Sequence, residues 1–189
     1  MTDTGNHSSY KISKPSLLAV LLYAKGAKGK PSEEIIGKTR LMKLMFLILK
    51  EGVIEEQLKG KFSFEPYKYG PFDSEIYDSI EALESMNIIE NITDVSFNSK
   101  EFEDEEYDTK ITFKLTDKGI EKTKRIVDIM PIKLYKKIET IKIIYSRKPL
   151  IQLLHYVYSK YPEYSTKSEL DLYWVIFSGQ NVQFSSLLF

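Results

Sequence analysis

The sequence predicts a mainly α fold of the α+β class, with a small antiparallel β-hairpin and a helical C-terminal extension. Apolar residues recur at helical spacing along most of the chain, whereas residues 110–115 alternate apolar and polar side chains as a half-buried strand does. The chain has 189 residues, which is enough to enclose one hydrophobic core.

Two helices are expected in the first third of the chain. The apolar run from Ser16 to Ala24 starts after Pro15 and ends at Gly26, which predicts a buried helix. Residues 25–30 contain two Gly and three Lys and predict a mobile basic surface loop. Residues 38–51 carry a broad apolar face and predict the second helix.

A short strand, a turn and a third helix follow. Residues 62–67 alternate large and polar side chains, which suits a strand. After the turn at residues 69–71, Asp73 or Ser74 can cap a helix that continues to Met86.

The remaining elements form a hairpin and a run of helices. A strand opens at Ile88, an acidic loop fills most of residues 91–108, and the strand over residues 110–115 returns. Thr116 caps the next helix. The C-terminal helices are predicted over residues 116–130, 131–146, 149–160 and 167–177.

The order helix, helix, short strand, helix, strand, loop, strand, helix is that of a winged helix. We therefore expect a winged-helix-like core over residues 16–130 and a helical extension over residues 131–177. A disordered tail is expected over residues 1–15, and an uncharged tail over residues 178–189 is expected to dock on the core or on a partner.

The composition excludes several classes of protein. The chain contains no cysteine, which removes disulfides and thiolate chemistry. A polar N-terminus and the lack of a long uncharged apolar run predict a cytoplasmic protein that does not insert into membranes. Abundant Ile, Lys, Glu and Tyr are typical of thermophiles, so an archaeal source is a further hypothesis.

The formal net charge of zero hides a strong charge pattern. Residues 1–60 carry 10 Lys and Arg against 6 Asp and Glu, residues 61–108 carry 3 against 14, and residues 109–189 carry 14 against 7. An acidic middle third therefore lies between two basic ends.

Three segments resemble one prokaryotic family. They are Gly37–Leu47 (GKTRLMKLMFL), Phe64–Tyr77 (FEPYKYGPFDSEIY) and Leu115–Gly119 (LTDKG). Together they resemble the SocA-like antitoxin domain, also called Panacea, and the related YwgA-like proteins, which carry a KLQKLLYL helix and a YGP turn. Residues 154–169 resemble the tail of archaeal YwgA-like members. The resemblance covers residues 16–169 and implies protein-binding roles, as antitoxins, proteolysis adaptors or companions of toxins and antiviral effectors, with no active-site residues.

The turn in the second of these segments has two interpretations. It can be a structural turn whose aromatic residues pack against the core, because Gly and Pro shape turns. It can instead be a partner-binding patch, because tyrosine anchors are favoured in interfaces. The candidate partner-binding residues are Phe64, Tyr67, Tyr69, Gly70, Pro71, Phe72 and Tyr77, together with Leu187, Leu188 and Phe189 at the uncharged C-terminus.

Two basic helix faces are candidates for nucleic-acid binding, because cations neutralise phosphates. The alternative for both faces is a solvated surface above an apolar stripe, and this is the reading that we prefer. The cations are Lys38, Arg40 and Lys43 on the second helix, and Lys118, Lys122, Lys124 and Arg125 on the helix after Thr116.

No catalytic, metal or cofactor site is predicted. His155 has no second histidine at metal-ligand spacing, and the carboxylates of residues 101–108 lie in a loop without the fixed geometry of acid–base catalysis. No glycine-rich phosphate loop and no plausible Ser, His and Asp set is present.

The acidic third helix decides between the two remaining functions. In a winged helix this element enters the DNA major groove, yet here it carries five carboxylates and no cation, so DNA repels it. The sequence therefore predicts a non-catalytic subunit that binds a separate effector in a toxin–antitoxin or antiviral system. The alternative is a regulator that binds nucleic acid through its basic ends, and a homo-oligomer is possible in either case.

Overall fold

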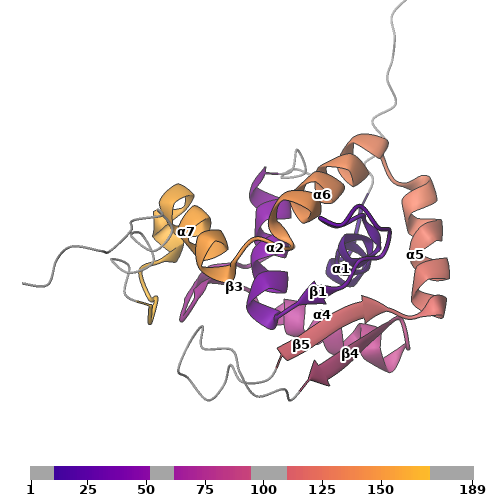
Figure 1. Ribbon diagram of the computed structural model, residues 1–189, viewed down its shortest axis with the longest axis horizontal. Helices are drawn as coiled ribbons and strands as arrows, with labels where there is room; N and C mark the ends of the chain where they lie inside the picture. Colours follow the sequence, from indigo (N-terminus) through magenta and orange to yellow (C-terminus); the bar gives the residue numbers. More distant parts are fainter. Residues whose placement is uncertain (1–10, 52–61, 95–109, 171–189) are drawn as a thin grey trace, which may run out of the picture.

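The computed structural model describes residues 11–51, 62–94 and 110–170, which fold mainly into helices with two small antiparallel sheets (Figure 1). This confirms the predicted fold class, which is mainly α with a small β component. The helices are α1 (Lys14–Tyr23), α2 (Lys38–Glu51), α4 (Ser74–Ser85), α5 (Asp117–Ile129), α6 (Ile132–Tyr145), α7 (Leu150–Lys160) and the 3-10 helix η2 (Pro162–Tyr164). The acidic residues 101–108 and the tail 178–189 lie outside the described residues.

Side-chain caps define where three of the helices begin. Asp73 accepts a hydrogen bond from the backbone of Glu75, and Thr116 accepts one from Gly119, as predicted. Ser13 caps α1 by accepting from the backbone of Ser16. Because α1 begins before Pro15 and Ile12 is buried, the predicted disordered tail is wrong for residues 12–15.

The larger sheet has the order β1-β5-β4. Strands β4 (Ile89–Asp94) and β5 (Lys110–Leu115) pair antiparallel as predicted, with Ile89 opposite Leu115. Strand β1 (Ile35–Ile36) adds to the other edge of β5 and was not predicted. Two residues are too few to give an alternating pattern.

The smaller sheet is a hairpin of β2 (Glu65–Tyr67) and β3 (Gly70–Phe72). The strand predicted over residues 62–67 therefore starts later than expected. Pro71, the last residue of the turn predicted over residues 69–71, lies inside β3 opposite Pro66. A proline is tolerated there because a short two-stranded sheet consists of edge strands.

Helix α1 lies at the centre of the core, with α4, α5 and α6 packed around it (Figure 1). Its apolar side chains are buried on all sides, as predicted for this run. The core continues through α2 into α6 and α7, where Ile138, Leu153 and Val157 are fully buried in the same cluster. The predicted extension therefore shares one core with the preceding residues.

The last predicted helix, over residues 167–177, is wrong at its start. Residues 167–170 are turns and bends, and the remainder lies outside the described residues. A hydrogen bond from the backbone of Glu169 to the carbonyl of Lys68 ties this segment to the β2–β3 hairpin instead.

We predict that Gly119→Ala strongly destabilises the protein. A Cβ atom at this position would lie 1.9 Å from the carbonyl oxygen of Ile88, which is backbone and cannot rotate away. We expect the free energy of unfolding, measured with urea, to fall by about 3 kcal/mol or more. Lys122→Ala, on the exposed side of the same helix, is the control and should change it by less than about 0.5 kcal/mol. Equal stabilities of the two variants would contradict the close approach of α5 to Ile88.

Candidate protein-binding site

The β2–β3 hairpin is held in a conformation that requires glycine. Gly70 has a φ of +88°, which favours glycine, and a Cβ atom there would lie 2.6 Å from Cε1 of Tyr158 in α7. Gly70 and Pro71 are buried. These two residues therefore shape the turn, which agrees with the structural reading of this motif.

Three of the predicted aromatic residues come together on this hairpin and on α4. The ring centroids of Tyr67 and Phe72 are 4.9 Å apart, and those of Phe72 and Tyr77 are 5.4 Å apart. Tyr67 is 45% exposed, and the other two rings are half-buried. We call Tyr67, Phe72 and Tyr77 the hairpin patch. At its edge, the Lys38 amine lies 5.6 Å from the Tyr77 ring centroid.

Phe64, also a predicted partner-binding residue, packs in a different place. Its ring stacks on Phe62 and meets Phe46 edge-on, with centroids 5.8 and 5.2 Å apart. Phe46 is fully buried in α2, so Phe64 covers the core. Tyr69 is half-buried in the turn. The structure thus divides the predicted aromatic set between a surface patch and core packing.

Two buried lysines contact the chain next to the hairpin patch. The Lys43 amine donates a 2.9 Å hydrogen bond to the carbonyl of Pro71. The Lys14 amine lies 2.7 Å from Asp73 and 2.7 Å from Glu75. Since Pro71 and Asp73 flank Phe72 in the chain, these contacts hold the chain on both sides of Phe72.

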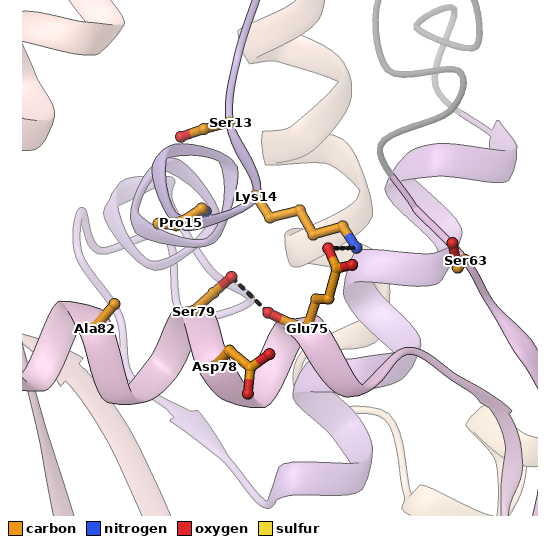
Figure 2. Close-up of a pocket in the computed structure, with 8 residues that line it drawn as sticks. All are labelled: Ser13, Lys14, Pro15, Ser63, Glu75, Asp78, Ser79 and Ala82. Carbon is orange, nitrogen blue, oxygen red and sulfur yellow. Dashed lines mark hydrogen bonds and ion pairs between the residues drawn. The ribbon is translucent and has the colours of Figure 1, made fainter.

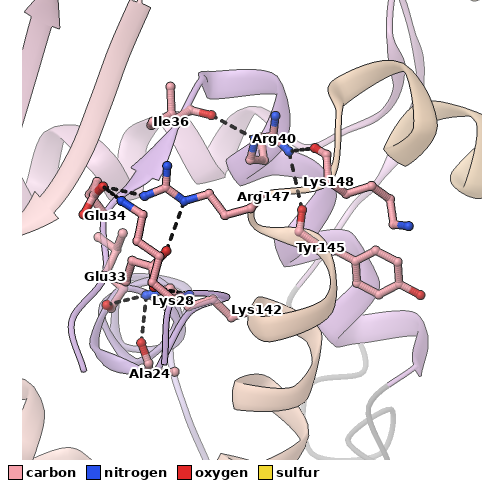
Figure 3. A network of polar contacts seen from close by, with 11 residues as sticks. Ala24, Lys28, Glu33, Glu34, Ile36, Arg40, Lys142, Tyr145, Arg147 and Lys148 are labelled. Atoms are coloured by element: carbon pink, nitrogen blue, oxygen red, sulfur yellow. Dashed lines mark hydrogen bonds and ion pairs between the residues drawn. The ribbon is translucent and has the colours of Figure 1, made fainter. Parts of the chain in front are cut away.

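The solvated face that we preferred for Lys38, Arg40 and Lys43 is wrong for Lys43, which is 3% exposed. The middle of α2 is enclosed on all sides, and this burial lowers the pKa of the Lys43 amine to about 7. Arg40 is half-buried and donates to the carbonyls of Ile36 and Lys148 (Figure 3). These three residues do not form one basic surface.

A third buried lysine ties α6 to the end of α1 (Figure 3). The Lys142 amine donates to the carbonyls of Leu22 and Ala24, at 2.7 and 2.9 Å. Burial lowers the pKa of this amine to about 7. Beside it, Arg147 pairs with Glu33 and Glu34 at 3.0 and 2.6 Å, which anchors the loop after α1.

The outer side of α4 is acidic and continues from the hairpin patch. Glu75, Asp78 and Glu81 are exposed, Glu84 is partly exposed, and α4 contains no Lys or Arg. A shallow open groove of about 520 Å³ runs between α4 and the start of α1 (Figure 2). It is lined by Ser13, Lys14, Glu75, Asp78, Ser79 and Ala82 among others.

The predicted basic residues of α5 are exposed, which is compatible with both interpretations of this face. Two of them form ion pairs within α5, Lys124 with Asp128 at 2.6 Å and Arg125 with Glu121 at 2.5 Å. Lys118 donates to the carbonyl of Met86. Helix α5 and the β2–β3 hairpin lie at opposite ends of the long axis of the molecule (Figure 1).

The structure adds little about the other residues that the sequence singled out. His155 is half-buried in α7. Within residues 11–51, 62–94 and 110–170, no group of His, Asp and Glu side chains could hold a metal ion. In the same part of the chain, no helix has the length and apolarity needed to cross a bilayer. Leu187, Leu188 and Phe189 lie outside the described residues.

Compared with protein-family models and with characterised proteins, the sequence matches none of them.

We predict that the stability of the protein rises with pH above neutrality. Lys43 and Lys142 have pKa values of about 7 in the folded chain against 10.5 ordinarily, so the unfolded chain binds more protons between these values. The free energy of unfolding should therefore rise from pH 7 towards pH 10, by at most about 1.4 kcal/mol per pH unit for each lysine. Above pH 10 the free energy of unfolding should fall again, because burial raises the pKa of Tyr158 to about 12 and the folded chain then binds more protons than the unfolded chain.

Denaturation of the Lys43→Met variant at several pH values tests the cause. Between pH 7.5 and pH 9.5, the free energy of unfolding of this variant should rise with pH less steeply than that of the wild type, by about 1.4 kcal/mol per pH unit. Lys122→Met removes an exposed lysine and should leave the slope unchanged. If Lys43→Met and wild type gave parallel curves, the buried amine would not be the source of the pH dependence.

Proposed function

We propose that this protein is a non-catalytic subunit that binds a separate protein through the hairpin patch and the acidic side of α4. One observation carries the proposal, namely that the two features form a continuous surface. Tyr77 belongs to the patch, and Glu81 and Glu84 follow it on the same side of α4 by four and seven residues.

This surface has the chemistry of an interface with a basic partner. Tyrosine combines a large apolar ring with a hydroxyl and is enriched among the residues that dominate binding energy. Clustered carboxylates attract a positively charged partner and raise the rate of association. A nuclease or another nucleic-acid-binding effector has such a basic surface.

The winged-helix arrangement of the core is part of the proposal. The order α1, β1, α2, α4, β4, β5, with β5 between β1 and β4 in the sheet, supports it. In that arrangement α4 is the helix that would enter DNA, and its carboxylates disfavour this role. The resemblance to SocA-like and YwgA-like proteins suggests that the partner is the effector of a toxin–antitoxin or antiviral system in the cytoplasm.

Capture of the partner from native cells tests the proposal. Tagged wild-type protein should retain a stoichiometric protein that survives nuclease treatment. Tyr67→Ala and the double variant Asp78→Lys with Glu81→Lys should each reduce its recovery by about tenfold or more, with unchanged circular dichroism.

The matched control is the double variant Glu121→Lys with Asp128→Lys, which makes the same change of net charge on α5. It should retain the partner. Equal recovery with all variants would place the interface elsewhere. Recovery of nucleic acid alone, lost as salt increases, would favour the alternative of a regulator that binds nucleic acid through exposed cations such as those of α5.

A further inference from the structure

A second exposed surface lies at the corner between α5 and α6, at the end of the molecule away from the hairpin patch (Figure 1). Ile129, the last residue of α5, is 75% exposed, and Ile132, the first residue of α6, is 67% exposed. Among the described residues these are the most exposed large apolar side chains. The two isoleucines therefore form an apolar tip where the chain turns.

Cations flank this tip on both helices. On α5, Arg125 and Lys122 precede Ile129 by four and seven residues, so the three side chains share one side of the helix. On α6, Lys136 follows Ile132 by four residues, and Lys133 is exposed beside it.

The nearby carboxylates do not cancel this positive charge. Exposed acidic residues of α5 and α6 are Asp117, Glu121 and Asp128, against exposed Lys118, Lys122, Lys124, Arg125, Lys133 and Lys136. Glu139 is 7% exposed and pairs with Lys136 at 2.7 Å. The ion pairs of Lys124 and Arg125 are solvent-exposed, and such pairs are weak enough to exchange for other anions.

The types of residue at the corner distinguish between the anionic partners that it could meet. Protein interfaces favour aromatic anchors such as Trp and Tyr, whereas the tip itself consists of two isoleucines. Nucleic-acid interfaces are polar and do not need two exposed isoleucines. Aliphatic side chains that enter the lipid interface, surrounded by lysines that attract anionic headgroups, are typical of peripheral membrane binding.

We propose that the α5–α6 corner binds the surface of an anionic lipid bilayer, with Ile129 and Ile132 in the interfacial region and the surrounding Lys and Arg at the headgroups. This is surface association and requires no membrane-spanning helix. It is independent of the proposed protein partner, which would be bound at the other end of the molecule, so membrane and partner could be engaged together.

Co-sedimentation of the full chain with vesicles tests this proposal. Binding to vesicles of phosphatidylcholine mixed with phosphatidylserine should exceed binding to phosphatidylcholine alone and should fall as salt increases. The double variant Ile129→Gln with Ile132→Gln should lower the partition coefficient by about tenfold or more. Lys122→Glu with Lys133→Glu should remove the preference for phosphatidylserine.

The matched control is Ile143→Gln with Ile144→Gln, which makes the same chemical change at two α6 residues that are 43% and 51% exposed. It should bind like the wild type. Equal binding to both kinds of vesicle, or no effect of the corner variants, would overturn the proposal. Tighter binding to duplex DNA that is unaffected by the isoleucine changes would also overturn it. A dimer that forms without lipid and dissociates when the isoleucines are replaced would overturn it as well.

Discussion

Three buried lysine amines bound to backbone carbonyls or carboxylates are the contacts on which the arrangement of this protein depends. Lys142 joins α6 to the C-terminal carbonyls of α1, Lys43 joins α2 to β3, and Lys14 joins α1 to Asp73. Each amine loses hydration when it is buried, and the hydrogen bonds offset part of this cost. An apolar side chain of the same size would fill the space but would leave the carbonyls of Pro71, Leu22 and Ala24 without these donors.

The sequence predicts those parts of the fold that local signals determine. The bounds of α2 and β5 agree with the structure because periodicity and caps are properties of neighbouring residues. Strand β1 and the buried lysines depend on segments distant in the chain, which a local pattern does not contain. One signal for Lys43 was nonetheless present, since apolar residues surround it on every side of α2 and such a helix must be enclosed.

The candidate site was also predicted only in part. Tyr67, Phe72 and Tyr77 form one patch, but Phe64 covers Phe46, and a sequence of alternating aromatic residues does not say which ring faces the core. The acidic character of α4 was evident from composition. Its continuity with the patch required the fold, because tertiary contacts such as those of Lys43 with Pro71 and of Lys14 with Asp73 place the hairpin and α4 side by side.

We expect a protein partner to cover the hairpin patch and the acidic side of α4, as proposed above. Hydrogen–deuterium exchange of the captured complex, compared with the free protein, tests it most directly. We expect slower exchange over residues 65–85 in the complex and unchanged exchange in α5. Slower exchange confined to α5 and α6, with residues 65–85 unaffected, would contradict it.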